Sequence, residues 1–385
     1  MKTYISLFSS AGVGCYGFKL NGFECIATCE LLSERLKIQK FNNKCQLEGG
    51  YICGDMTKDE THNLINEQIQ LYKDKFNIED VDVIIATPLC QGMSELNRKR
   101  NDELKRNSLV IESIKVINEI KPKFFIFENV RAFMKTTCTD CDGINKPIHD
   151  AIFEALGKSY DIYYEIINFC EYGNPSSRTR TLVIGTRKDL NVNPNDFFPD
   201  KEPTRTIRYV IGNFKPLTVM GEIDENDIYH SFRPYPERLT RCIAATPQGC
   251  SAIDNANILD KPYHIDKDGN VKYSVSGFKN KYYRQIYDNV PRCITTRNDT
   301  LSSQSTVHPI DNRVFSIREL MEMQSIPKEF NWSEKTFEEL NAMSIDEKKS
   351  YLKANALNIR RNIGECVPTI IFKKIAAKIA KFLDK

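Results

Sequence analysis

Apolar and polar positions follow two alternating patterns along the first half of the chain. Short, mostly apolar runs at residues 4–8, 23–29, 50–53, 81–86, 124–127, 160–168 and 181–185 predict strands. Stretches with helical spacing of apolar positions lie between several of them, at residues 33–41, 61–72, 107–120 and 150–156. Strands that alternate with helices in this way indicate βαβ units. We therefore expect an α/β domain with a mostly parallel sheet.

The pattern changes after residue 188, where prolines separate short segments and helical periodicity fades. Helical signals return at residues 316–323, where Ser316 and Glu319 predict a capping box, and at residues 368–382. The sequence thus predicts a second, smaller, loop-rich domain. We assign residues 1–188 and 345–385 to the first domain and residues 189–344 to the second domain and its return hinge.

Composition is that of an ordinary globular protein, with 385 residues, 41% hydrophobic and 27% charged. The net charge is +3, and residues 201–300 by themselves carry a charge of the same size. No apolar stretch is long enough to predict a membrane helix or fits a signal peptide. The thirteen cysteines are odd in number and scattered, which favours free thiols in a reducing cytosol. Cys138 and Cys141 lack a second ligand pair, so we expect no metal.

A glycine-rich turn, L-F-S-S-A-G-V-G-C-Y-G-F at residues 7–18, begins at the end of the first predicted strand. Such a turn lets the backbone approach a ligand closely, although a plain tight turn has the same composition. Glu30 ends the second strand, where a carboxylate can hold ribose hydroxyls, and Asp55 follows the third. This combination fits NAD, FAD or S-adenosylmethionine.

Three further motifs place reactive groups at the ends of predicted strands. Cys90 follows the strand at residues 81–86, and Glu128 follows the one at 124–127. The carboxyl ends of parallel strands are where open α/β folds bind ligands. Arg178 and Arg180, two residues apart on an extended segment, point to the same face. We interpret this set as a candidate catalytic site.

In this order, the motifs resemble the DNA (cytosine-5) methyltransferase family, in its single-chain bacterial and phage form. The resemblance extends to R-C-I-T-T-R-N-D at residues 292–299, His308-Pro309, S-I-R-E-L at 316–320 and N-I-G-E-C-V-P at 362–368. It covers most of the chain. It implies a Rossmann-like, S-adenosylmethionine-dependent methyltransferase fold with a smaller target-recognition domain.

The resemblance also implies the reaction, which is methylation of carbon-5 of cytosine within a specific double-stranded DNA sequence. Cys90 would add to carbon-6 of a flipped-out base, because a thiolate is the best side-chain nucleophile near neutral pH. Glu128, its pKa raised by burial, would donate to ring nitrogen N3. Arg180 would hold the exocyclic oxygen, and Arg178 would brace Glu128 or a phosphate.

The binding residues that the resemblance and the strand ends imply form two sets. The expected cofactor site, for S-adenosylmethionine and its product S-adenosylhomocysteine, comprises Phe8, Ser10, Ala11, Gly12, Val13, Gly14, Glu30, Leu31, Asp55, Met56, Pro88, Asn107, Leu109, Glu365, Cys366 and Val367. The expected DNA-binding residues are Gln91, Ser94, Arg98, Lys99, Arg100, Lys279, Lys281, Arg284, Thr295, Thr296 and Arg297. Double-stranded DNA is the expected partner, and a cognate restriction endonuclease is a candidate second one. We expect a monomer in the bacterial cytosol or nucleoid, with no membrane association.

The chain departs from the family pattern at several positions. Ser6 stands where an acid is frequent, Ser10 where glycine is, Leu89 where proline is, Ser176 where glutamine is, and Glu365 where asparagine is. None of these changes removes a nucleophile or a proton-transfer group.

Three alternative functions remain. An RNA cytosine methyltransferase is opposed by the long variable region, and a non-catalytic regulator by the intact Cys90 and Glu128. A nicotinamide oxidoreductase would leave Cys90 and the basic second domain unexplained.

Overall fold

The structure is a computed structural model that describes residues 1–88, 104, 107–275 and 277–385. The chain folds into two compact units. Residues 1–172, 179–201 and 366–385 form the first unit, and residues 173–178 and 202–365 form the second. The first unit thus continues past the expected boundary at residue 188. Residues 345–365, expected in the first domain, pack with the second unit.

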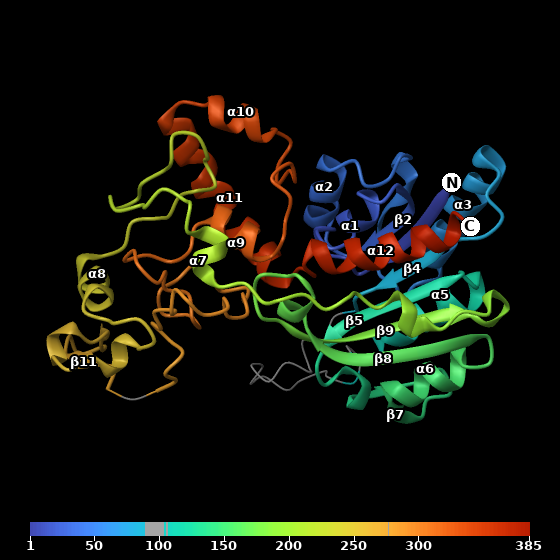
Figure 1. Ribbon diagram of the computed structural model, residues 1–385, viewed down its shortest axis with the longest axis horizontal. Helices are drawn as coiled ribbons and strands as arrows, with labels where there is room; N and C mark the ends of the chain where they lie inside the picture. The colour runs from blue at the N-terminus through green and yellow to red at the C-terminus, as the bar shows by residue number, and fades with distance from the viewer. Residues whose placement is uncertain (89–103, 105–106, 276) are drawn as a thin grey trace. The chain divides into compact units, whose positions relative to one another are not determined.

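A seven-stranded sheet forms the centre of the first unit, with strand order β3-β2-β1-β4-β5-β9-β8 (Figure 1). The first five strands in this order are parallel, and β9 and β8 are each antiparallel to the preceding strand. The strands are β1 Lys2–Leu7, β2 Phe23–Glu30, β3 Tyr51–Cys53, β4 Val83–Ala86, β5 Phe124–Val130, β8 Tyr160–Asn168 and β9 Thr179–Arg187. The predicted α/β fold with a mostly parallel sheet is confirmed.

Helices cover both faces of this sheet. They are α1 Tyr16–Lys19, α2 Ser33–Phe41, α3 Asp59–Phe76, α5 Leu109–Ile120, α6 Ile148–Leu156 and α12 Thr369–Leu383. Neighbouring strand residues point to opposite faces, so Ile84 packs with α3, α5 and α6, whereas Ile85 packs with α1 and α12. Burial on both faces explains why these strands read as continuous apolar runs.

The chain reverses its direction of winding at β1, which lies between β2 and β4. In an open α/β sheet the loops on either side of such a point diverge and leave a crevice at the carboxyl ends of the strands. Here those loops are the glycine-rich turn after β1 and the segment after β4 that leads to Cys90. The topology therefore brings two predicted motifs to one edge of the sheet.

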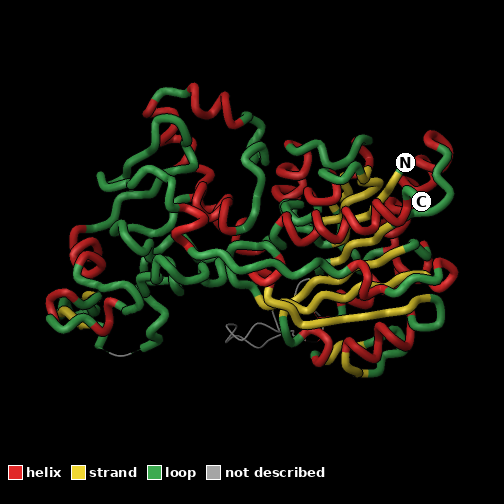
Figure 2. Tube along the Cα trace, viewed as in Figure 1, coloured by secondary structure: helices red, strands yellow, loops and turns green. Residues whose placement is uncertain are grey.

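The second unit consists mainly of loops, with several short helices and one long one, as the tube trace shows (Figure 2). Its elements are α7 Ile207–Ile211, α8 Glu237–Ala244, β10 Tyr263–Ile265, β11 Val271–Tyr273, α9 Ile317–Met323, α10 Phe337–Ala342 and α11 Ile345–Glu365. The capping box predicted at Ser316 and Glu319 is present at the start of α9. The 21-residue helix α11 was not predicted, because most of its positions are polar and few are buried.

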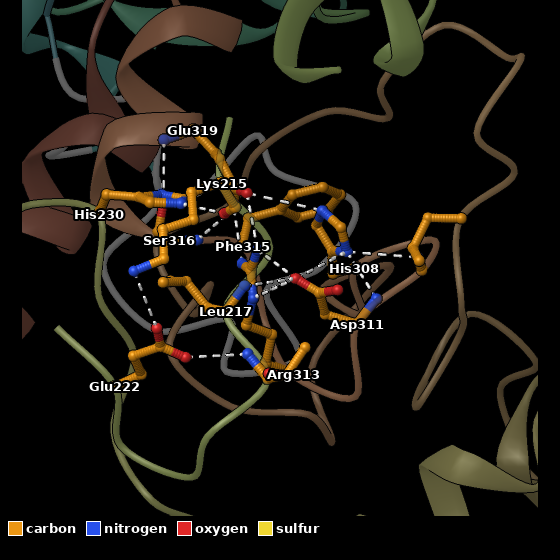
Figure 3. A network of polar contacts seen from close by, with 12 residues as sticks. Lys215, Leu217, Glu222, His230, His308, Asp311, Arg313, Phe315, Ser316 and Glu319 are labelled. Atoms are coloured by element: carbon orange, nitrogen blue, oxygen red, sulfur yellow. Dashed lines mark hydrogen bonds and ion pairs between the residues drawn. The ribbon is translucent and has the colours of Figure 1, made fainter. Parts of the chain in front are cut away.

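A buried network of charged side chains joins several loops of the second unit (Figure 3). Arg313 is 1% exposed and donates to the two carboxylate oxygens of Glu319 at 2.7 and 2.8 Å, and to Asp311 at 2.9 Å. His308 lies beside them and accepts the backbone N–H of Asp311 at its Nδ1, at 2.9 Å. A unit with few regular elements is thus held together by paired charges in its interior.

Two smaller features bear on the sequence predictions. Cys138 is buried and Cys141 exposed, on the hairpin of β6 Thr137–Thr139 and β7 Asn145–Pro147. Within the described ranges, no group of three histidine, cysteine or acidic residues is arranged to hold a metal ion. In that part of the chain no helix is both long and apolar enough to span a bilayer.

Candidate functional site

The turn after β1 is held in an unusual backbone conformation. Phe8 and Ser10 have φ angles of 60° and 51°, which are rare for residues other than glycine, and Gly12 has 77°. The backbone N–H of Phe8 donates to Cys29 at the end of β2, at 3.0 Å. Its carbonyl accepts from the Thr87 hydroxyl after β4, at 2.8 Å. The turn is therefore fixed to the strands on both sides of β1.

Glu30 contacts this turn from the end of β2. One carboxylate oxygen accepts the backbone N–H of Ser10 at 2.9 Å, and the other accepts from Leu31 N–H at 3.2 Å and from Arg35 at 3.4 Å. Glu30 is 6% exposed, whereas the side chain after it, Leu31, is 60% exposed. A buried carboxylate beside an exposed apolar side chain suits a ligand that presents both hydroxyls and a flat ring.

Asp55 and Met56 follow β3, as predicted. The Asp55 carboxylate is exposed and accepts from the backbone N–H and hydroxyl of Thr57, at 3.0 and 2.9 Å. Met56 is buried and its carbonyl lies 2.7 Å from His62 Nε2. The two acidic side chains, Glu30 and Asp55, thus end adjacent parallel strands.

Two glycines of the turn region face helix α12. A Cβ on Gly14 would lie 2.9 Å from Val367, and one on Gly17 would lie 2.4 Å from the backbone nitrogen of Lys373. Thr369 donates its hydroxyl to the Val13 carbonyl at 3.0 Å. The sequence interpretation assigned glycines here to close ligand approach, whereas at Gly14 and Gly17 the structure uses them for close packing of α12. Ala11 and Val13 are buried.

Asn107 and Leu109 lie at the start of α5. The Asn107 side-chain amide donates to the Thr137 carbonyl at 3.0 Å, while its Oδ1 is buried and has no hydrogen-bond partner among the described residues. A buried acceptor without a donor is costly unless a ligand satisfies it. Together with the acids at the strand ends, this acceptor fits a nucleoside cofactor.

Glu128 lies in β5 opposite Leu182 of β9, and its side chain is 7% exposed. Arg180 Nε lies 3.4 Å from Glu128 Oε1, and the Arg180 side chain is 18% exposed. The brace on Glu128 that the sequence assigned to Arg178 is therefore provided by Arg180. The pair lies on adjacent strands and is held there by the sheet.

Asn129 connects β5 to the segment that precedes Cys90. Its side-chain amide donates to the Pro88 carbonyl at 3.0 Å, and its Oδ1 accepts the Val130 N–H at 2.8 Å. Cys90 itself, with Gln91, Ser94, Arg98, Lys99 and Arg100, lies outside the described residues. The described part thus holds the chain two residues before Cys90 against the strand that carries Glu128.

Arg178 belongs to the second unit and is buried. Its guanidinium donates to the carbonyls of Gly364 and Glu365 at the end of α11, both at 3.2 Å. Gly364 is close to another predicted segment of that unit, since a Cβ there would lie 2.3 Å from the Thr295 carbonyl. Cys366 and Val367 follow in the first unit and are both buried.

The predicted DNA-binding residues of the second unit differ in their exposure. The side chains of Lys279 and Arg297 are 81% and 69% exposed, and Lys281 is also exposed. Thr295 and Thr296 are half-buried. Arg284 is 4% exposed, and its donors go to carbonyls that include those of Thr246 and Ile243 and to the Asn312 side chain. The prediction that Arg284 binds DNA is therefore wrong in this conformation. Its guanidinium instead links several loops of the second unit through hydrogen bonds.

Several residues that shape the site were not predicted. Thr87 and Asn129 fix its two loops, and Gln39 and Lys44 lie beneath the turn after β1. The sequence did contain a signal for Asn129, because it directly follows the predicted Glu128. Gln39 and Lys44 lie in a region that has no motif, so only the fold reveals them.

Comparison with known proteins decides the family. The profile described as C-5 cytosine-specific DNA methylase matches residues 2–381. The chain belongs to this family. The Type II methyltransferase M1.HgaI of Avibacterium volantium is 28% identical over 393 residues, covering 97% of each chain. M.XorII of Xanthomonas oryzae, also a Type II methyltransferase, is 23% identical over 402 residues, covering 99% of this chain and 85% of that protein.

Solved structures show the same fold at lower identity. A prophage protein from E. coli that is assigned as a DNA modification methyltransferase matches with a TM-score of 0.65 and 17% identity, over 100% of both chains. The S. pombe Dnmt2 methyltransferase matches with a TM-score of 0.59 and 11% identity, again over 100% of both chains. The methyltransferase is thus a C-5 cytosine DNA methylase with the Rossmann-like fold of that family, whose members use S-adenosylmethionine.

Proposed function

We propose that this methyltransferase modifies cytosine within one specific double-stranded DNA sequence, with Cys90 as nucleophile and Glu128 as proton donor. The observation that carries the proposal is the pairing of Arg180 with Glu128 on strands held beside the segment that leads to Cys90. A guanidinium and a buried carboxyl group side by side can relieve the charge that develops when a nucleophile adds to a pyrimidine ring.

In this proposal, the Cys90 thiolate forms a bond to carbon-6 of the flipped-out base, and the electron pair of the ring double bond moves toward carbon-5. Glu128 delivers a proton at ring nitrogen N3, so that no full negative charge accumulates on the ring. Arg180 holds Glu128 in place and donates from its guanidinium to the exocyclic oxygen of the bound base. After methyl transfer, a base such as a water molecule takes the carbon-5 proton, and the electron pair of that bond restores the double bond between carbon-5 and carbon-6. Cys90 then leaves with its bonding electrons, and the N3 proton returns to Glu128.

S-adenosylmethionine, when bound, supplies the methyl group as an electrophile and leaves as S-adenosylhomocysteine. Glu30 and Asp55 would hold its polar groups, Leu31 and Phe8 would pack on its ring, and Asn107 Oδ1 would accept a hydrogen bond. Pro88, Leu109, Cys366 and Val367 would complete the walls. The support is that Phe8, Glu30 and Asp55 lie at or just after the ends of β1, β2 and β3, around the switch point of the sheet, and that Asn107 Oδ1 is a buried acceptor.

The second unit would read the DNA sequence. Lys279, Lys281 and Arg297 are exposed cations there, which suits contacts to phosphates, and Thr295 and Thr296 are half-buried hydroxyls that can approach base edges. Since similar proteins are Type II methyltransferases, we propose that this one belongs to a restriction-modification system and protects a sequence from a cognate endonuclease.

Methylation-sensitive sequencing of DNA from a host that expresses the chain tests this function. We expect 5-methylcytosine at one recurring sequence, and none when Glu128→Gln is expressed at the same level. Glu128→Gln should lower the rate by about 10²–10⁴-fold, because the amide cannot deliver a proton. Unmodified DNA in the wild-type host would contradict the proposal, and so would methylation of cytosine in RNA alone.

A further inference from the structure

The side chain of Lys44 is buried beneath the turn after β1, 7% exposed. The end of α2 brings it there. The N–H of Asn43 donates to the Lys40 carbonyl at 2.9 Å, and that of Lys44 to the Gln39 carbonyl at 3.2 Å, while Asn43 has a φ of 46°. This is a Schellman ending, which turns the chain back across the helix terminus.

Four oxygens surround the Lys44 ammonium group. They are Ser6 Oγ at 2.7 Å, and Ser9 Oγ, Thr28 Oγ1 and Gln39 Oε1, each at 2.9 Å. All four are uncharged, and they come from β1, the turn, β2 and α2. A buried cation without a carboxylate is expensive, and apolar residues of similar size are commonly as stable at such positions. Stability alone is therefore a weak reason for a lysine here.

One of the four acceptors around Lys44 connects it to the strained part of the turn. Gln39, which presents Oε1 to Lys44, donates its Nε2 to the Ser10 carbonyl at 2.5 Å. Ser10 is the residue whose N–H is held by Glu30 at 2.9 Å, and its φ is 51°. The Ser10 peptide groups are thus held by Glu30 on the nitrogen and by Gln39 on the oxygen. Lys44 fixes which way the Gln39 amide faces, because only its oxygen can accept from an ammonium.

We propose that Lys44 is a positioning residue for the cofactor, acting through Gln39 to hold Ser10 in the conformation that receives S-adenosylmethionine. The inference rests on the proposed cofactor site. Backbone strain of this kind persists only where surrounding groups over-determine it, and the Lys44 network is such a set of groups. Without Lys44, Gln39 Oε1 is left with the Thr28 hydroxyl at 2.7 Å, which can accept as well as donate and therefore does not fix the direction of the amide. The turn then relaxes to a conformation that fits the cofactor less well.

The first test replaces Lys44 by methionine, which has a similar length and no charge. We expect Lys44→Met to bind S-adenosylhomocysteine about tenfold or more weakly in calorimetry, the scale of one lost hydrogen bond to a charged group. The matched control is Lys348→Met. Lys348 is also a buried lysine, 6% exposed, but it lies in α11 and donates to the Glu225 carbonyl at 3.1 Å. The Lys348→Met variant should bind S-adenosylhomocysteine with the affinity of the wild type.

The second test, Gln39→Glu, separates positioning from plain stability. The new carboxylate would pair with Lys44, so the thermal midpoint of the ligand-free protein should hold or rise. It would also place an oxygen against the Ser10 carbonyl, so affinity for S-adenosylhomocysteine should fall about tenfold. A fall in affinity without a fall in stability supports the inference, even if Lys44→Met does not fold.

Unchanged affinity in folded Lys44→Met, or in Gln39→Glu, would overturn the inference and leave the proposed function in place. The inference would also be overturned if Gln39→Glu lowered the affinity and the thermal midpoint together. If the wild-type chain itself bound no S-adenosylhomocysteine, the proposed cofactor site would fail, and this inference with it.

Discussion

At the scale of single residues, Glu30 has one observed role and one proposed role. Its carboxylate holds the Ser10 amide at 2.9 Å, and it lies at the strand end where we place the cofactor ribose. A buried carboxylate that shapes the binding turn and also contacts the ligand should be sensitive to any substitution.

Glu30→Ala should weaken S-adenosylmethionine binding by ~1–3 kcal/mol, the value of a lost hydrogen bond to a charged group. Calorimetry measures this directly. Glu34→Ala is the control, because Glu34 is exposed on α2 and forms an ion pair with Lys37, three residues further along the helix. Equal affinities in Glu30→Ala and the control would rule out the assignment.

Several residues of the site could be predicted from sequence because strand ends are visible in it. Glu30, Asp55 and Glu128 were located in this way, since each terminates or closely follows an apolar run. Lys44 and Gln39 could not be, because a helix ending brings them under the turn and no local pattern encodes that contact. Arg284 was misplaced for the related reason that a basic residue in a basic segment looks exposed until its carbonyl partners are known.

At the scale of elements, α1 and α12 touch through their backbones. The sequence places glycines in the turn region but does not show what they face. Two helices can approach closely where a residue at the contact has no Cβ. Gly17 is such a residue, because an added Cβ would lie 2.7 Å from the Thr369 carbonyl. The periodic helices were predicted, whereas the polar helix α11 was not, because its few apolar positions lack a clear helical spacing.

Gly17→Ala should destabilise the first unit by ~1–3 kcal/mol through overpacking against α12, measured by urea unfolding. Gly22→Ala serves as comparison. Gly22→Ala has the opposite character: an added Cβ meets nothing within 4 Å, and its cost comes from the φ of 75°, a backbone strain that Gly17 does not have. If Gly17→Ala were as stable as the wild type, the close approach of α1 and α12 would be in error.

At the scale of the whole molecule, resistance to acid should depend on the buried charges of the second unit. Burial lowers the pKa of His308 to about 4, with Arg313 acting in the same direction. Burial opposes the ionisation of Glu319, but its basic neighbours, Arg313 foremost, together outweigh burial and hold the pKa of that carboxyl well below its usual range. Both groups therefore bind fewer protons in the folded state than in the unfolded state.

This difference in bound protons means that the free energy of unfolding falls as the pH falls. His308 contributes its full stabilisation above about pH 6.5, its unfolded pKa, and loses it as the pH falls toward 4. The loss should amount to roughly 3 kcal/mol for His308 alone. His308→Asn should weaken the dependence of the unfolding free energy on pH between pH 6.5 and 4. The asparagine side chain can accept the same backbone N–H, but it does not titrate. His264→Gln, an exposed histidine of β10, should leave the wild-type profile unchanged, and a flat wild-type profile would contradict the account.

The central claim, that Cys90 attacks the base, is tested most directly by covalent trapping on DNA with 5-fluorocytosine at the target. Fluorine cannot leave as a proton does, so elimination stalls and the thioether persists after methyl transfer. On a denaturing gel the wild type should form a shifted band, and so should Cys53→Ser, which changes an exposed cysteine elsewhere. Cys90→Ser should form none while still binding DNA, because affinity comes mainly from phosphate contacts. An equal band from Cys90→Ser, or none from the wild type with DNA binding intact, would contradict the mechanism.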